Sequence, residues 1–138
     1  MYKVIWMMLL VLMNSNVTAG WTKIVDAKDT TEGPNHGSLY SVYADLDTMR
    51  NSDDSIKIWE LYDYQAVQWG EGIKPYLSLK VRTEYDCSGG RSREHYVSIF
   101  SENMGKGNRG GEKEYVHSWA SLEPDTVGTK LWKFACGK

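Results

Sequence analysis

The residues of this chain best suited to covalent chemistry are its two cysteines, Cys87 and Cys136. Cys87 ends a run with strand-like alternation, and Cys136 lies in the last turn of an expected helix. In an oxidising compartment two such thiols join, so we expect a disulfide that ties the helix to the sheet. The alternative is a reactive pair of cysteine and histidine. That chemistry requires an exposed thiol, whereas the alternation points Cys87 into the core.

No metal, cofactor or phosphate site is expected. The histidines His36, His95 and His117 are scattered, and neither H-x-x-x-H nor C-x-x-C spacing occurs. The glycine-rich stretch at residues 105–111 resembles a phosphate-binding loop only loosely. It lacks both the G-x-x-x-x-G-K-[ST] form and a helix after it.

Carboxylates are the remaining candidates for acid–base chemistry, namely Asp63, Glu84 and Asp86. Carboxylates on the wet face of a strand, beside basic side chains, are mostly structural ion pairs. We expect such pairs between Asp86 and Arg93 and between Glu84 and His95. The sequence therefore predicts no catalytic residue and no enzyme.

Short strands separated by turn residues position these side chains, as in a small antiparallel sheet. Strands are expected at residues 21–25, 39–44, 55–64, 76–87, 91–100 and 114–119. Residues 45–50 are expected to form one helical turn or a tight bend, and residues 65–75 and 101–113 to form loops. A helix is expected over residues 124–136, capped by Asp125 or Thr126. The fold class is therefore α+β, an antiparallel sheet of about six strands with a C-terminal helix packed on one face.

The alternation in residues 76–87 predicts one buried face and one wet face, the latter carrying Ser78, Lys80, Arg82, Glu84 and Asp86. A two-residue turn at Gly89-Gly90 joins this strand to the next, because glycine reaches positive φ without cost. In that register Asp86 lies opposite Arg93 and Glu84 opposite His95. A three-residue turn would instead oppose Glu84 to Glu94.

The N-terminus has the pattern of a secretory signal peptide, residues 1–19. Lys3 precedes the apolar run Val4–Met13, and Val17-Thr18-Ala19 forms a small-residue cleavage site. The alternative is an uncleaved anchor, but the run is shorter than the roughly 20 residues that span a bilayer. We expect export to the periplasm, the cell surface or the medium, and one mature domain at residues 20–138 without a transmembrane anchor.

The net charge and the aromatic residues limit the classes of partner that we expect the protein to bind. Loss of Lys3 with the signal leaves 15 of the 16 basic residues against 18 acidic ones, so a nucleic-acid partner is not expected. Tyr62, Tyr64, Trp69 and Tyr76 gather around one loop, and tyrosine and tryptophan are favoured in protein recognition. These four are the candidate protein-contact residues. The alternative is that half of them pack in the core.

Several short motifs give the chain a resemblance to a known family. They are Trp59–Tyr64, Tyr85-Asp86-Cys87, Arg91-Ser92-Arg93, Met104-Gly105, Val127-Gly128 and Leu131–Cys136. In their order and spacing the chain resembles the surface-adhesin protein E family of Gram-negative bacteria. The resemblance implies an antiparallel sheet with a C-terminal helix tied by a disulfide. It also implies an adhesin that binds host extracellular-matrix and serum proteins, and it implies no binding residue.

Two functions from different classes follow. The first is an exported, non-enzymatic domain that binds another protein, such as a host extracellular-matrix protein, at the cell envelope. The second is a periplasmic small-ligand-binding or accessory domain with a pocket between sheet and helix. An open edge strand in so small a sheet can pair with a second copy, so a homodimer is a further expectation.

Overall fold

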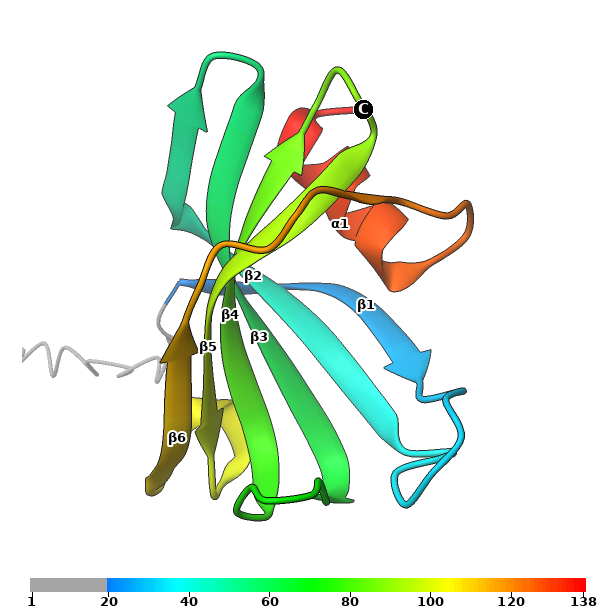
Figure 1. Ribbon diagram of the computed structural model, residues 1–138, viewed down its shortest axis with the longest axis vertical. Helices are drawn as coiled ribbons and strands as arrows, with labels where there is room; N and C mark the ends of the chain where they lie inside the picture. The colour runs from blue at the N-terminus through cyan, green and yellow to red at the C-terminus, as the bar shows by residue number, and fades with distance from the viewer. Residues whose placement is uncertain (1–19) are drawn as a thin grey trace, which may run out of the picture.

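One antiparallel sheet and one α-helix make up the described part of the chain, residues 20–138 of a computed structural model (Figure 1). The predicted signal peptide, residues 1–19, lies outside the described residues. Six strands follow chain order, β1-β2-β3-β4-β5-β6, and the short β7 pairs with the first residues of β5. The elements are β1 (Trp21–Lys28), β2 (Leu39–Ser52), β3 (Ser55–Gln68), β4 (Tyr76–Asp86), β5 (Arg91–Phe100), the 3-10 turn η1 (Asn103–Gly105), β6 (Arg109–Glu114), β7 (Ala120–Ser121) and α1 (Val127–Cys136). The predicted fold class is confirmed.

The main core lies between α1 and one face of the sheet. Leu131 and Ala135, one turn apart on α1, are buried against Val42, Ile58 and Tyr85. The i, i+4 spacing places both helix residues on the same face, which is why they are buried together. Lys130 and Lys133, on the other side of the helix, are both exposed and face away from this core.

The helix begins at Val127, later than expected, because of its capping residues. Asp125 has φ of +60°, a left-handed conformation that stops the helix from starting earlier. Thr126 is the N-cap, and its hydroxyl accepts a hydrogen bond from the Thr129 amide at 3.2 Å. At the other end, Gly137 adopts φ of 67° and its amide donates to the Lys133 carbonyl. Both ends of α1 are therefore set by local side-chain and backbone chemistry.

Thr126→Ala is expected to lower the free energy of unfolding by about 1 kcal/mol, because the Thr129 amide loses its acceptor. Thr126→Ser is the matched control, since serine keeps the hydroxyl, and it should change stability by much less. Urea denaturation followed by circular dichroism measures both. Equal losses in the two variants would contradict a capping role for Thr126.

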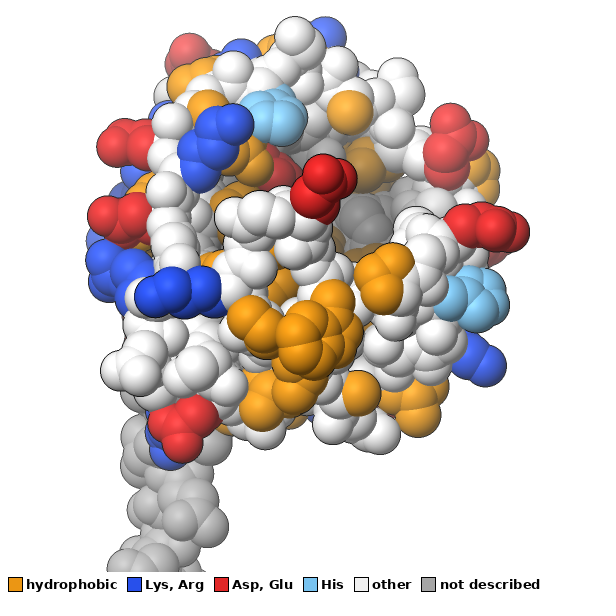
Figure 2. All heavy atoms as spheres, turned by 60° about the horizontal axis from the view of Figure 1, so that its bottom comes forward, with side chains coloured by type: hydrophobic (Ala, Val, Ile, Leu, Met, Phe, Trp, Pro, Cys, Tyr) orange, Lys and Arg blue, Asp and Glu red, His pale blue; other side chains and the backbone are white. Residues whose placement is uncertain are grey.

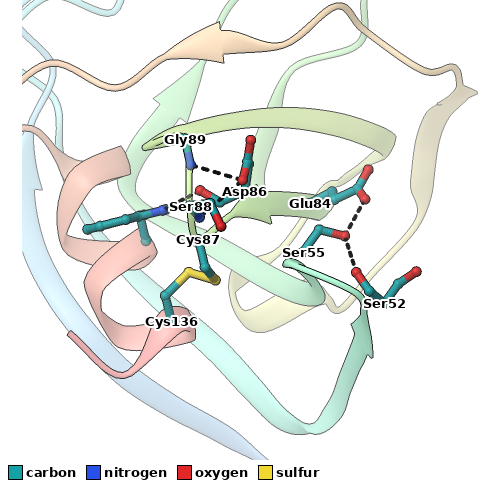
Figure 3. Close-up of a disulfide and its surroundings, with 9 residues drawn as sticks. Ser52, Ser55, Glu84, Asp86, Cys87, Ser88, Gly89 and Cys136 are labelled. Atoms are coloured by element: carbon teal, nitrogen blue, oxygen red, sulfur yellow. Dashed lines mark hydrogen bonds between the residues drawn. A yellow bond between two sulfur atoms is a disulfide. The ribbon is translucent and has the colours of Figure 1, made fainter.

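The predicted disulfide between Cys87 and Cys136 is confirmed, with the two Cα atoms 5.5 Å apart (Figure 3). Cys87 follows β4 directly, and its amide donates to the Asp54 carbonyl at 2.9 Å. The Trp132 indole nitrogen, one turn before Cys136, donates to the Asp86 carbonyl at 2.8 Å. The last turn of α1 is thus held at the β4–β5 turn by a covalent bond and a hydrogen bond.

The predicted register of the β4–β5 hairpin is wrong. A four-residue connection, residues 87–90, joins the strands, so Asp86 lies opposite Arg91 and Glu84 opposite Arg93. The Asp86 side chain accepts from the Ser88 and Gly89 amides at 3.1 and 3.0 Å, and the Gly90 amide donates to the Asp86 carbonyl. Only Gly90 of the two glycines has positive φ. Asp86 therefore sets the turn.

Three other expectations along the sheet are also wrong. Residues 45–50 belong to β2 and form an irregularity opposite β3, held by the Thr48 hydroxyl, which donates to the Asp45 carbonyl and accepts from the Trp59 amide. β6 begins at Arg109 inside the expected glycine-rich loop, where a Cβ on Gly110 would lie 3.1 Å from Ile99. The strand expected at residues 114–119 keeps only its first residue, in β6.

Candidate binding sites

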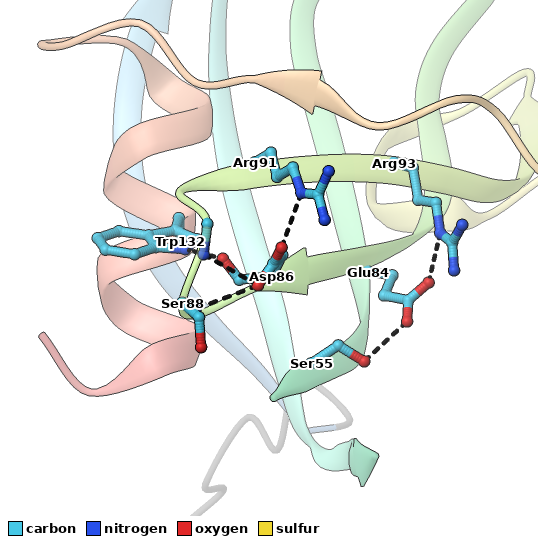
Figure 4. Close-up of polar contacts among 8 residues, drawn as sticks. Ser55, Glu84, Asp86, Ser88, Arg91, Arg93 and Trp132 are labelled. Carbon is cyan, nitrogen blue, oxygen red and sulfur yellow. Dashed lines mark hydrogen bonds and ion pairs between the residues drawn. The ribbon is translucent and has the colours of Figure 1, made fainter. Parts of the chain in front are cut away.

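The wet face predicted for β4 is in fact partly covered. Glu84 is only 5% exposed and Ser78 is fully buried. The Glu84 carboxylate accepts from Arg93 Nε at 2.6 Å and from Ser55 Oγ at 2.8 Å (Figure 4). It also lies 2.9 Å from His95 Nε2. Burial alone would raise the pKa of Glu84, but these partners together lower it to about 2. The carboxylate stays ionised and enclosed by its partners, which is a structural role.

Asp86 pairs with a different arginine from the one predicted. Its carboxylate accepts from Arg91 Nε at 2.7 Å, and Arg93 goes to Glu84 instead (Figure 4). The shift follows from the four-residue turn, which moves each partner along β5. Both arginines also lie over the Trp119 ring, at 4.9 and 4.1 Å from its centre. Trp119 thereby holds the segment before β7 against the hairpin.

One carboxylic acid is sealed in the interior. Glu60 on β3 is 1% exposed, and it accepts hydrogen bonds from the Tyr85 hydroxyl and, at 2.7 Å, the Thr83 hydroxyl. Burial raises the pKa of Glu60 to about 7, although both hydrogen bonds act to lower it. Sequence reasoning did not predict this burial, because Glu60 lies in an alternating, aromatic strand. Its enclosed position makes it a structural acid rather than a group that meets a ligand.

Residues 20–138 contain no candidate metal centre. No group of three or more histidine, cysteine or acidic side chains is placed to hold a metal ion there. Near the helix, where a pocket is expected, the structure has a hollow of about 210 Å³ beside Trp132 and the β4–β5 turn. Asp63, the third carboxylate considered, instead accepts from Asn103 and from the Met104 amide and holds η1 against β3.

The predicted contact aromatics divide into two groups. Tyr62, Tyr64 and Tyr76 are half-buried and pack in a row with Tyr40: the ring centres of Tyr40 and Tyr64 are 5.2 Å apart, and those of Tyr64 and Tyr76 are 6.0 Å apart. Burial raises the pKa of Tyr64, as expected for a covered phenol. These tyrosines therefore serve mainly as packing. Trp69 is different, because it is 55% exposed.

Trp69 stands on a fixed support at one end of the sheet. The Asn35 side chain accepts from the Trp69 amide and donates to the Trp69 carbonyl, both at 2.8 Å, so the two neighbouring loops are joined. Ile73 packs on Gly70, where an added Cβ would lie 2.6 Å from it. Four exposed hydrophobic residues lie at this end, and we call them the apolar end: Leu39, Val67, Trp69 and Ile73. Figure 2, which brings this end forward, shows hydrophobic side chains gathered there.

A second site lies on the sheet face opposite α1, and sequence reasoning missed it. It is a hollow of about 590 Å³, which we call the sheet hollow. Arg82 on β4 pairs along the backbone with Trp59 of β3 and Tyr96 of β5, whose rings contact each other edge to face with their centres 5.3 Å apart. Residues from both flanks of the sheet, including Trp21 and Tyr115, line the same hollow, so the sheet curls around it. The alternation did place Lys80 and Arg82 together, but nothing in it indicated the curl.

Comparison with known families identifies the chain. The family model described as surface-adhesin protein E matches residues 21–137, nearly all of the described part. The chain belongs to the surface-adhesin protein E family. The matched segment includes both cysteines and every element of the fold, so the resemblance stated from the motifs is confirmed. No curated protein sequence matches the chain.

Solved structures of the family show the same fold. Protein E of Haemophilus influenzae, in its crystal form II, has a TM-score of 0.58 at 16% identity, covering 84% of this chain and 96% of that one. Protein E from non-typeable Haemophilus influenzae has a TM-score of 0.58 at 16% identity, covering 89% and 79%. At this identity the likeness shows the fold alone. No helix within residues 20–138 has the length and apolar character that crossing a membrane requires.

Proposed function

We propose that this member of the surface-adhesin protein E family is an exported, non-enzymatic domain that binds another protein at the cell envelope through its apolar end. The observation that carries the proposal is Trp69, a large side chain more than half exposed on a backbone that Asn35 fixes from both sides. Tryptophan is enriched in the hot spots of protein interfaces. A pre-positioned ring loses little conformational freedom on binding, which favours affinity.

Export is part of the proposal. Cleavage after Ala19 would release a domain that begins just before β1, and the disulfide is typical of proteins that fold outside the cytoplasm. The partner proposed is a host extracellular-matrix protein, in keeping with the adhesin family. Fractionation combined with protease treatment of intact cells tests the location: protection of the protein in intact cells would count against display at the surface. Pairing of an open sheet edge with a second copy remains a proposal for the oligomeric state.

Trp69→Ala is expected to weaken binding to an extracellular-matrix partner by roughly thirtyfold or more, since truncated hot-spot residues cost about 2 kcal/mol or more. Binding of the purified protein to a panel of immobilised matrix proteins, measured by surface plasmon resonance, identifies the partner and gives the comparison. Leu46→Ala is the matched control, because Leu46 is 46% exposed but lies outside the apolar end. An unchanged affinity in Trp69→Ala would show that the apolar end is not the contact surface.

A further inference from the structure

The sheet hollow holds two cations that nothing in the described residues neutralises. Lys80 and Arg82 both line it from β4, an inner strand of the sheet. Neither forms an ion pair or donates a hydrogen bond within residues 20–138, whereas Arg91, Arg93 and Arg109 all pair with carboxylates. Lys80 is instead flanked by ring faces, 5.1 Å from the centre of Phe100 and 5.9 Å from that of Trp21. Half-buried, unpaired cations in a hollow favour an anionic ligand.

Charges at the two flanks of the hollow limit what that anion can be. Asp45 on β2 and Glu114 on β6 line it from opposite sides, each two strands away from β4. Unpaired positive charge therefore lies on β4 and negative charge at both flanks, where the further lining cation Arg109 is paired with Glu112. A long polyanion, such as a nucleic acid, would meet repulsion at either side. The layout instead fits a ligand with an acid group at its centre and hydrogen-bond donors at its ends.

The walls add a third constraint. Trp59 and Tyr96 lie on the strands on either side of Arg82. Three further aromatic residues line the hollow, whose volume is about 590 Å³: Trp21, Phe100 and Tyr115. The negative face of an aromatic ring attracts polarised C–H bonds, such as those on the apolar face of a sugar. A volume of this size lies in the range of small-molecule sites.

We propose that the sheet hollow binds an acidic saccharide, specifically one that carries a uronic acid. The uronate carboxylate lies between Lys80 and Arg82, the sugar hydroxyls donate to Asp45 and Glu114, and the ring faces rest on Trp59 and Tyr96. None of the residues that line the hollow belongs to the apolar end, so this site is separate from the proposed protein contact. Its test is therefore independent of Trp69.

Isothermal titration calorimetry of the purified protein tests the site with a disaccharide of glucuronate and N-acetylglucosamine. Neutral chitobiose is the matched probe without the carboxylate. We expect the acidic disaccharide to bind and to quench tryptophan fluorescence, and we expect its affinity to fall with added salt. Chitobiose should show no saturable heat. Equal binding of the two disaccharides, or no binding of either, would overturn the proposal.

Lys80→Gln and Arg82→Gln should each lower the affinity for the acidic disaccharide by roughly tenfold to a hundredfold, the usual range for losing a charge-assisted hydrogen bond. Lys130→Gln on the outer side of α1 removes the same charge elsewhere and should leave affinity unchanged. Melting temperatures show that each variant is folded, and Arg82→Gln tests the site independently of the packing of Lys80 on Gly105. Unchanged affinity in both Lys80→Gln and Arg82→Gln would show that the sheet hollow is not the saccharide site. Trp69→Ala should bind the disaccharide as tightly as the wild type.

Discussion

Replacing Cys87 and Cys136 together by serine should lower the free energy of unfolding by about 4 kcal/mol. The disulfide closes a loop of 49 positions between β4 and the end of α1. In the chain-entropy account a cross-link over such a loop stabilises the fold by about 4 kcal/mol, because it restricts the unfolded chain. A domain of this size has roughly 5–15 kcal/mol of stability in all. Urea denaturation of the oxidised wild type and the double variant measures the difference.

The reduced wild type is the matched control for the disulfide. It should unfold at the same urea concentration as Cys87→Ser/Cys136→Ser, because both lack the cross-link and keep the same contacts of α1 with the sheet. Amide hydrogen exchange should accelerate most in α1, whose remaining connections to the β4–β5 turn are noncovalent, such as the bond from Trp132 to the Asp86 carbonyl. A decrease in the free energy of unfolding of less than about 1 kcal/mol would mean that the unfolded chain is already restricted between residues 87 and 136.

Sequence reasoning succeeded where a local pattern decides the structure. Period-two alternation predicts a strand from any short window, and Arg91–Phe100 was predicted with its exact bounds. The helix was predicted because Leu131 and Ala135 repeat at helical spacing and Thr126 is a good N-cap. The disulfide followed from cysteine count and compartment, since no other thiol is present in the chain.

Sequence reasoning was wrong where distant contacts or turn chemistry decide the structure. Two adjacent glycines predict a two-residue turn, but the Asp86 side chain bonds to two amides of the loop and makes the connection longer. That change moves Arg93 from Asp86 to Glu84. The irregularity in β2 depends on Thr48 reaching the Trp59 amide, a contact between different strands. The sheet hollow needs both flanks of the sheet to curl together, and no short window contains that information.

Glu60 should make the stability of the protein fall as pH rises between about 4.5 and 7. Burial disfavours the charged form and raises the pKa of Glu60 from its ordinary value of 4.5 to about 7 in the folded protein. Below 4.5 the folded and unfolded states are both protonated, so Glu60 contributes no pH dependence. Between the two pKa values only the unfolded state loses its proton, which favours unfolding. Above 7 both states are ionised, and the loss levels off at about 3 kcal/mol.

Glu60→Gln removes this titration and keeps the size of the side chain. Its amide can still accept from Thr83 and contact Tyr85, so the variant should fold, and its stability should lack the decline between pH 4.5 and 7. Glu84 does not interfere, because its lowered pKa of about 2 makes its own contribution fade only as pH falls below about 4.5. Urea denaturation of both proteins across that pH range gives the difference directly. A difference between wild type and variant that stays constant with pH would show that Glu60 does not titrate in the folded protein near neutrality, and its carboxyl group would then be held charged despite its burial.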